Sequence, residues 1–345
     1  MGAAESGVGT AVLAQKQGYE VFVSDMGAIK DRYKSVLSER GIEWEEGQHT
    51  EQRILSADEV VKSPGIPDTA PMVQKLIAQD TPILSEIEFC SRYTKGRMLC
   101  ITGSNGKTTT TSLIYYIMQN AGKNVGLGGN IGRSLALQIA EDDKDWYVVE
   151  LSSFQLDNCF AFHPHIAVLL NITPDHLDRY EYDMQHYVDS KMRIIQNQTA
   201  EDEFIYWTGD EYVDKELRRR ADGEHIPAST PSSRPAVEGQ PTLRPFDDDD
   251  FDRLSLDFTL PGKHNKRNAL AAYYAAKAAG VDENVIRECL KTFPGVEHRL
   301  EFVADKAGVR YINDSKATNV DACYVALDAM TRPTVLVIGG KDKGN

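Results

Sequence analysis

The stretch that decides the fold is Met98-Leu99-Cys100-Ile101-Thr102-Gly103-Ser104-Asn105-Gly106-Lys107-Thr108-Thr109, an apolar run, a glycine-rich loop and the start of a helical pattern. A strand that leads into such a loop places backbone N–H groups, a helix N-terminus, a lysine charge and a hydroxyl around one anion. The loop departs from GxxxxGK[ST] because Ile101 stands in place of the first glycine, and the alternative is an ordinary glycine turn. The adjacent Lys107 favours a phosphate loop that binds a nucleoside triphosphate.

Length and charge limit the class of protein. The chain has 345 residues, which predicts about two or three domains, and it is 41% hydrophobic and 26% charged. It lacks an apolar run of membrane-spanning length, and its net charge of −14 disfavours non-specific binding to nucleic acid or anionic lipid. We therefore expect a globular protein with small-molecule ligands and with neither a nucleic-acid nor a membrane partner.

The five cysteines are widely spaced, odd in number and without a CxxC pair, and no signal peptide opens the chain. This usage is typical of a protein in the reducing cytoplasm and predicts no zinc site.

The order of motifs predicts three units of alternating helices and strands. Residues 1–92 begin with the glycine turn Gly2–Gly7 and place Asp25 after the next strand, which is the βαβ pattern of dinucleotide-binding folds. Residues 93–296 hold strand-like runs at 98–102, 146–150 and 166–170, which predict a parallel sheet. Residues 297–345 begin a third such unit.

Two segments carry specific structural expectations. Five prolines between Ile226 and Pro245, followed by Asp247–Asp250, predict a surface excursion without a packed element. Residues Thr334–Ile338 predict a buried parallel strand. Because no strand precedes the glycine turn and nothing follows the last strand to cover it, we expect a chain truncated at both ends.

Polar residues follow the ends of two predicted strands. Glu150 ends one, and Asn171, Asp175 and His176 follow another, so all should lie on the sheet edge that carries the phosphate loop. A carboxylate oxygen suits Mg²⁺ beside phosphates. Taken singly, Glu150 could be a surface carboxylate and His176 a structural loop histidine; their shared placement favours a metal site.

Several co-linear motifs together resemble the Mur ligases. They are the phosphate loop, Gly128–Gly132, Glu150–Leu156, Asn171–Tyr180 and Asn313–Asn319. The resemblance covers essentially the whole chain. It implies an α/β fold with a Rossmann-like N-terminal domain, a central P-loop domain and a truncated Rossmann-like C-terminal domain, at 1–92, 93–296 and 297–345.

The resemblance also implies a reaction. It is the ATP-dependent ligation of D-glutamate to UDP-N-acetylmuramoyl-L-alanine through an acyl phosphate, in cytoplasmic peptidoglycan precursor synthesis, carried out by a monomer. Two alternatives stay open. One is another Mur ligase or folylpolyglutamate synthase, and the other is a substrate-binding fragment with little turnover because its third domain is cut.

At the reaction centre, the resemblance implies that Lys107 contacts the transferring phosphate and that Thr108 lies at the metal. Glu150 and His176 match residues of two Mg²⁺ sites, and Lys191 matches a lysine carbamylated by CO₂ that helps to hold a metal. Read without the resemblance, Lys191 on a predicted helix would be a solvated surface lysine.

The remaining assignments also rest on the resemblance. ATP is assigned to Gly103, Ser104, Asn105, Gly106, Lys107, Thr108, Thr109, Asn268, Arg299, Asp314 and Lys316. The UDP-linked substrate is assigned to Glu5, Ser6, Asp25, Gly65 and Asn130, and D-glutamate to Thr318 and Lys343.

Overall fold

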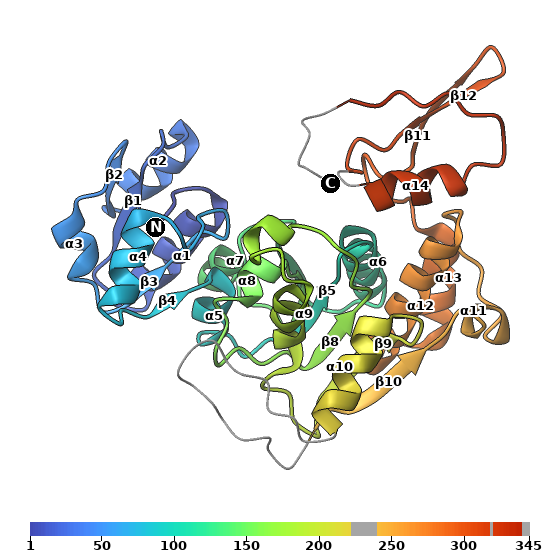
Figure 1. Cartoon of the computed structure of the whole chain (residues 1–345), viewed down its shortest axis with the longest axis horizontal. Helices are drawn as coiled ribbons and strands as arrows, with labels where there is room; N and C mark the ends of the chain where they lie inside the picture. The colour runs from blue at the N-terminus through green and yellow to red at the C-terminus, as the bar shows by residue number, and fades with distance from the viewer. Residues whose placement is uncertain (222–239, 318–319, 340–345) are drawn as a thin grey trace.

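A six-stranded parallel sheet forms the centre of the computed structural model, which describes residues 1–221, 240–317 and 320–339 (Figure 1). Its strands are β5 (Arg97–Thr102), β6 (Val125–Gly129), β7 (Trp146–Glu150), β8 (Ile166–Leu169), β9 (Glu203–Trp207) and β10 (Thr242–Phe246). They lie in the order β10-β9-β8-β5-β7-β6, and every neighbouring pair is parallel. The predicted α/β class with a central parallel sheet is confirmed.

Both faces of this sheet are buried, because alternate side chains of a strand point to opposite faces. In β5, Met98 and Cys100 enter one apolar cluster, whereas Leu99 and Ile101 enter another. The second face is covered by α6 (Lys107–Asn120), α12 (Lys263–Ala278) and α13 (Glu283–Thr292). The first face is covered by α5 (Glu86–Ser91), α7 (Leu135–Glu141), α8 (Ser153–Leu156) and α9 (Met184–Met192).

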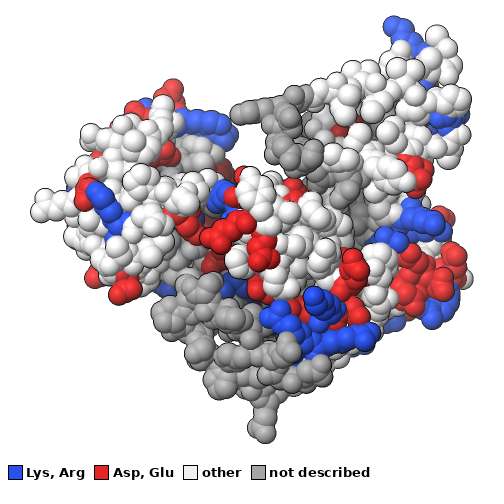
Figure 2. Space-filling model, in the orientation of Figure 1, with Lys and Arg blue, Asp and Glu red and all other residues white. Residues whose placement is uncertain are grey.

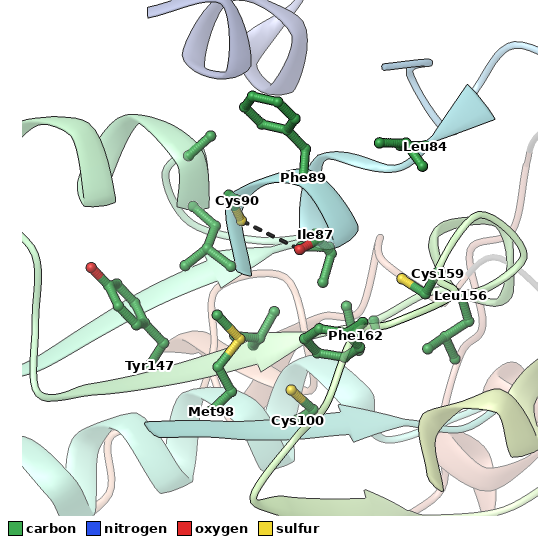
Figure 3. Packing of buried hydrophobic residues seen from close by; sticks show 14 of the residues in the cluster. Leu84, Ile87, Phe89, Cys90, Met98, Cys100, Tyr147, Leu156, Cys159 and Phe162 are labelled. Atoms are coloured by element: carbon green, nitrogen blue, oxygen red, sulfur yellow. Dashed lines mark hydrogen bonds between the residues drawn. The ribbon is translucent and has the colours of Figure 1, made fainter. Parts of the chain in front are cut away.

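The cluster on the first face contains three of the cysteines, which lie among Met98, Phe162 and Leu84 (Figure 3). Burial raises the pKa of the Cys159 thiol to about 12 and raises the pKa values of Cys90 and Cys100 as well. These thiols are held protonated as apolar packing groups.

The N-terminal unit consists of short parallel strand pairs and helices. Its elements are α1 (Glu5–Lys16), β1 (Phe22–Asp25), α2 (Asp31–Glu39), β2 (Glu43–Glu46), α3 (Glu51–Leu55), β3 (Val60–Val61), α4 (Pro71–Ala78) and β4 (Ile83–Leu84). β1 pairs with β2, and β3 pairs with β4. α1 packs on α7, so the apolar cluster of this unit is continuous with the first face of the central sheet.

The remaining elements of the described residues are two 3₁₀ helices, three α-helices and a pair of strands. They are the 3₁₀ helices η1 (Leu177–Arg179) and η2 (Arg193–Ile195), α10 (Glu211–Ala221), α11 (Asp250–Arg253), β11 (Glu301–Lys306), β12 (Val309–Asn313) and α14 (Val320–Asp328). β11 and β12 form an antiparallel hairpin that lies apart from the central sheet (Figure 1). The exact domain limits at 92/93 and 296/297 stay predictions.

The expectation that residues 226–250 hold no packed element was wrong for residues 242–250. Thr242–Phe246 forms edge strand β10, and Asp250–Arg253 forms α11, while residues 226–239 lie outside the described residues. The strand exists because it pairs with β9, and Phe246 anchors it in the core. Pro245 is tolerated because an edge strand does not need every N–H in a ladder.

The expectation of a buried strand at Thr334–Ile338 was also wrong. Val335 and Val337 are each 92% exposed, and no described strand pairs with this segment. An apolar run becomes a strand only where a neighbour accepts its hydrogen bonds. Here β11 and β12 pair only with each other.

Charged side chains of both signs are interspersed on the face shown in Figure 2. Basic side chains gather where α10 ends, and its last turn carries Arg218, Arg219 and Arg220. These arginines pair with Asp214 and Glu216 on the same helix. In the part of the chain that the structure describes, no helix is both long and apolar enough to cross a membrane.

Candidate active site

The predicted phosphate loop joins the carboxyl end of β5 to the N-terminus of α6. Gly106 immediately precedes the helix with φ +86°, a left-handed conformation that favours glycine. A Cβ at this position would lie 2.4 Å from Oδ1 of Asn268 on α12. The structure therefore brings Asn268 against the loop and leaves no space for a side chain between them; the assignment of Asn268 to ATP stays a prediction.

The loop is fixed by the segment that follows β8. Ser104 N donates to the carbonyl oxygen of Asn171 at 2.8 Å, and Asn105 N donates to its Oδ1 at 2.8 Å. Asn171 Nδ2 donates back to the carbonyl oxygen of Asn105 at 3.0 Å. The sequence placed Asn171 on this edge without giving it a role. Its side-chain amide accepts from the N–H group of Asn105 and donates to the carbonyl oxygen of the same residue, which holds the loop in place.

Two lysines converge on one backbone oxygen of the loop. Lys107 Nζ and Lys191 Nζ donate to the carbonyl oxygen of Gly103 at 2.8 and 2.9 Å. Burial lowers the pKa of Lys107, although the charges of Glu150 and Asp175 oppose this. Burial, together with the neighbouring Lys107, holds the pKa of Lys191 well below its usual range. Both effects favour a neutral Lys191 amine.

The view of Lys191 as a solvated lysine was wrong, since its side chain is almost completely buried. It lies on α9, which packs against α8, and its Nζ lies 4.5 Å from the centre of the Tyr187 ring, one helical turn earlier. The Tyr187 hydroxyl lies 3.1 Å from Oγ of Ser104 in the loop. Sequence reasoning missed Tyr187; its i, i+4 spacing from Lys191 was the available signal.

Glu150 is buried at the carboxyl end of β7, and its two oxygens differ. Oε1 accepts a hydrogen bond from Asn130 Nδ2 at 2.8 Å, whereas buried Oε2 has no hydrogen-bond partner among the described residues. A buried carboxylate oxygen without a donor fits a cation such as Mg²⁺. Thr108 supplies a hydroxyl in the first turn of α6.

The protein offers few other metal ligands here. No group of three His, Cys, Asp or Glu side chains within residues 1–221, 240–317 and 320–339 could hold a metal ion. An ion at Glu150 would therefore take further oxygens from phosphates and water, which is how Mg²⁺ is usually held beside nucleotides.

His176 lies at the exposed rim of this edge. Its φ is +53°, its ring packs edge-on to Phe154 at 5.2 Å, and Nε2 lies 3.7 Å from the Asp175 carboxylate. A left-handed backbone at a residue other than glycine is uncommon and is often found at functional sites.

Of the predicted residues of the third unit, Arg299 reaches the site electrostatically. Burial lowers its pKa, while the charges of Asp314 and Glu150 oppose that shift. Asp314 accepts a hydrogen bond from Leu300 N at 3.0 Å, and Lys316 is exposed, with its backbone N bonded to His298. Thr318 and Lys343 lie outside the described residues.

The residues predicted for the UDP-linked substrate lie around α1 and at the loop after β3. Asp25 accepts hydrogen bonds from the backbone N–H groups of Ala3 and Gly27 at 2.7 and 2.8 Å. Glu5 accepts one from the Tyr33 hydroxyl at 3.0 Å. The Ser6 carbonyl accepts one from Thr10, and Gly65 is exposed. Asn130 lies apart from these, on Glu150.

Two family profiles match the chain. The profile described as the Mur ligase middle domain matches residues 101–276, and the profile described as the MurD N-terminal domain matches residues 8–72.

Curated relatives match over the full chain. The UDP-N-acetylmuramoylalanine–D-glutamate ligase of Bacteroides fragilis is 56% identical, covering all of this chain and 78% of the relative. The enzyme of the same name from Porphyromonas gingivalis is 48% identical over the same shares.

Solved structures share the fold at low identity. MurF of Acinetobacter baumannii superimposes with a TM-score of 0.59 at 16% identity, covering 94% of this chain and 76% of that one. UDP-N-acetylmuramate:L-alanyl-gamma-D-glutamyl-meso-diaminopimelate ligase of Neisseria meningitides superimposes with a TM-score of 0.57 at 20% identity, covering 84% of this chain and 95% of that one.

Proposed function

The chain belongs to the Mur ligase family, and on that basis we propose that it joins D-glutamate to UDP-N-acetylmuramoyl-L-alanine at the expense of ATP. It is an amide-bond-forming ligase that uses ATP and acts on small molecules. The observation that carries the proposal at the site is the convergence of the half-buried Lys107 and the buried Lys191 on the carbonyl oxygen of Gly103, in the loop before α6. A cation such as Lys107 at a helix N-terminus suits a polyphosphate.

The proposed reaction has two steps. A carboxylate oxygen of UDP-N-acetylmuramoyl-L-alanine attacks the γ-phosphorus of ATP, so that an acyl phosphate forms and ADP leaves. The amine of D-glutamate then attacks the acyl carbon, the C–N bond forms, the C–O bond to phosphate breaks, and the amine releases a proton. Negative charge develops on phosphate and carbonyl oxygens in these steps, and positioned cations and N–H groups stabilise it.

In this reaction Lys107 neutralises the transferring phosphoryl group. Ser104 N and Asn105 N already donate to Asn171, so the later part of the loop from Gly103 to Thr109, at the N-terminus of α6, binds the phosphates through backbone N–H groups. Asn268, Arg299, Asp314 and Lys316 complete the ATP site. Arg299 is suited to this role because its charge already acts on Lys107 and Glu150. Thr318 and Lys343 would receive the two carboxylates of D-glutamate.

Thr108, Glu150, His176 and a carbamate on Lys191 would hold Mg²⁺ at two sites. The bound ions would offset negative charge on the phosphates. The carbamate forms when the neutral Lys191 amine adds to the carbon of CO₂ and releases a proton, which turns a buried neutral amine into a carboxylate. The burial of Lys191 beside Lys107 supports this step, because a second buried positive charge there is disfavoured.

Glu5, Ser6, Asp25, Gly65 and Asn130 would bind the UDP-linked substrate. We also propose that the protein works as a monomer in the cytoplasm, where thiols stay reduced; this is consistent with five free cysteines, four of them buried.

Phosphate release with UDP-N-acetylmuramoyl-L-alanine, ATP and one amino acid at a time tests the proposal. We expect turnover with D-glutamate, with product mass raised by one glutamyl residue, and background release with L-glutamate, L-alanine, meso-diaminopimelate or L-lysine. Turnover with one of these and none with D-glutamate would contradict it.

A further inference from the structure

The N-terminus of α7 is held by two carboxylates from other helices. Glu86 on α5 is buried, and its Oε1 accepts hydrogen bonds from Ser134 Oγ at 2.5 Å and from Ala136 N at 3.1 Å. Glu5 on α1 accepts one from Ser134 N at 3.3 Å. Ser134 is the N-cap of α7, so these carboxylates fix the point where the helix begins.

α1 packs closely against this point through Gly9. A Cβ at Gly9 would lie 1.9 Å from Ser134 Oγ, so only glycine allows α1 to pack there. Ser134 is thus enclosed by α1 on one side and by the Glu86 carboxylate on the other.

The same turn reaches the reaction centre at its other end. It begins at Asn130, whose backbone N donates to the carbonyl oxygen of Glu150 at 2.9 Å and whose Nδ2 donates to Glu150 Oε1 at 2.8 Å. Five residues therefore connect Glu150 to a helix start that Glu86 and Glu5 hold. A shift at Ser134 would move Asn130, whereas Glu150 is held within β7 by the pairing of that strand with β5 and β6.

Burial of the Glu86 carboxyl is energetically unfavourable in its charged form. Burial raises the pKa of its carboxyl to about 7, even though Ser134 and Ala136 donate to it, and the nearby Glu5 charge acts in the same direction as burial. An apolar side chain would fill this space without that cost. The acid supplies what an apolar residue cannot, namely acceptors for the donors at the start of α7.

We propose that Glu86 is a positioning residue for the UDP-linked substrate, acting by fixing the turn from Asn130 to Ser134. This inference rests on the proposed function, because Asn130 and Glu5 are assigned to that substrate. Glu86 acts through Ser134 and Ala136 and contacts no reacting group. The phosphate loop lies on another connection, between β5 and α6, and is held by Asn171, so we expect ATP binding to be unaffected by Glu86.

The test compares Glu86→Ala and Ser134→Ala with Glu88→Ala. Glu88 is an equally buried acid on the same helix, but it accepts hydrogen bonds from the backbone of Phe160, Ala161 and Phe162, away from the turn. We expect Glu86→Ala and Ser134→Ala to raise KM for UDP-N-acetylmuramoyl-L-alanine about tenfold, the loss expected for a buried hydrogen bond. KM for ATP should stay unchanged in both variants. Glu88→Ala should lower stability and leave the KM values for both substrates unchanged. Glu86→Gln, which keeps an acceptor, should restore KM.

A second readout needs no substrate. Amide hydrogen exchange at residues 130–136 should accelerate in Glu86→Ala and Ser134→Ala, return to the wild-type rate in Glu86→Gln, and stay unchanged in Glu88→Ala. Equal KM changes for both substrates, no change for either, or unaltered exchange at the turn would overturn the inference. If the wild-type protein fails to ligate D-glutamate, the proposed function fails, and exchange still decides whether Glu86 fixes the turn.

Discussion

Lysines at the carboxyl edge of the central sheet and acids on α5 differ in their hydrogen-bond partners. At the sheet edge, Lys107 and Lys191 share the Gly103 carbonyl as an acceptor. On α5, the buried Glu86 and Glu88 accept hydrogen bonds from hydroxyl or backbone N–H groups within the fold.

This difference in hydrogen-bond partners distinguishes side chains that can bind a ligand from side chains that stabilise the fold. A lysine cation such as Lys107, whose acceptors are neutral carbonyls, retains the capacity to bind an anion, and here that anion would be a phosphate. A buried acid that accepts from internal donors has little capacity left and stabilises the elements that supply those donors. We therefore expect substitutions at the lysines to act on the reaction, and those at the acids to act on stability and position.

The largest expected effect is at Lys107. Lys107→Ala should lower the ligation rate about 10³-fold, because a positive charge at the transferring phosphate is lost. Rates with D-glutamate measure this, circular dichroism checks the fold, and Lys95→Ala at an exposed position serves as the matched control. A retained rate would remove Lys107 from the reaction.

Glu86 should give the next effect, on stability. Its pKa is raised from 4.5 to about 7, so the folded state holds a proton that the unfolded state releases between these values. The wild-type protein should therefore lose stability as pH rises from 4.5 to 7, by about 3 kcal/mol at most. Glu86→Gln cannot ionise, and its stability relative to wild type should rise by that amount across the same window.

Urea unfolding of both proteins at pH 5, 6, 7 and 8 measures this difference. If the two stabilities run parallel across the window, the Glu86 carboxyl does not titrate as its burial implies.

The third effect in order of size is expected at Lys191. Lys191→Ala should lower the ligation rate about 10–100-fold, the range found when support of a metal site is lost. Acetate or propionate should restore part of the activity if a buried carboxylate is what the site needs. Full activity without added acid would show that neither the amine nor its carbamate takes part.

The smallest effect should come from Ser85, the N-cap of α5, whose Oγ accepts a hydrogen bond from Glu88 N at 3.1 Å. Ser85→Ala should cost about 1 kcal/mol of stability and leave both KM values unchanged. Thermal unfolding and steady-state kinetics measure the two parts. A changed KM for either substrate would mean that α5 acts on the site through more than Glu86.

The sequence predicted three of the six strands of the central sheet, β5, β7 and β8, because these strands carry a local signal. Residues 98–101, 146–149 and 166–169 are apolar on both faces, and only a strand covered on both sides uses such a run. The same reasoning failed at Thr334–Ile338, because apolar composition does not specify a pairing partner. It failed at Thr242–Phe246 for the opposite reason, since pairing with β9 formed a strand from a segment rich in proline and polar residues.

The sequence alone was enough to predict the phosphate loop, the parallel strands on either side of it and the family. Each of these is signalled by motifs whose residues lie close together in the chain. Only the tertiary structure decided that Lys191 is buried beside Lys107, that Glu150 keeps one oxygen without a donor, and that Glu86 holds the start of α7. Burial and hydrogen-bond supply are set by which distant segments meet, and these two quantities determine whether a charged side chain binds a ligand or supports the fold.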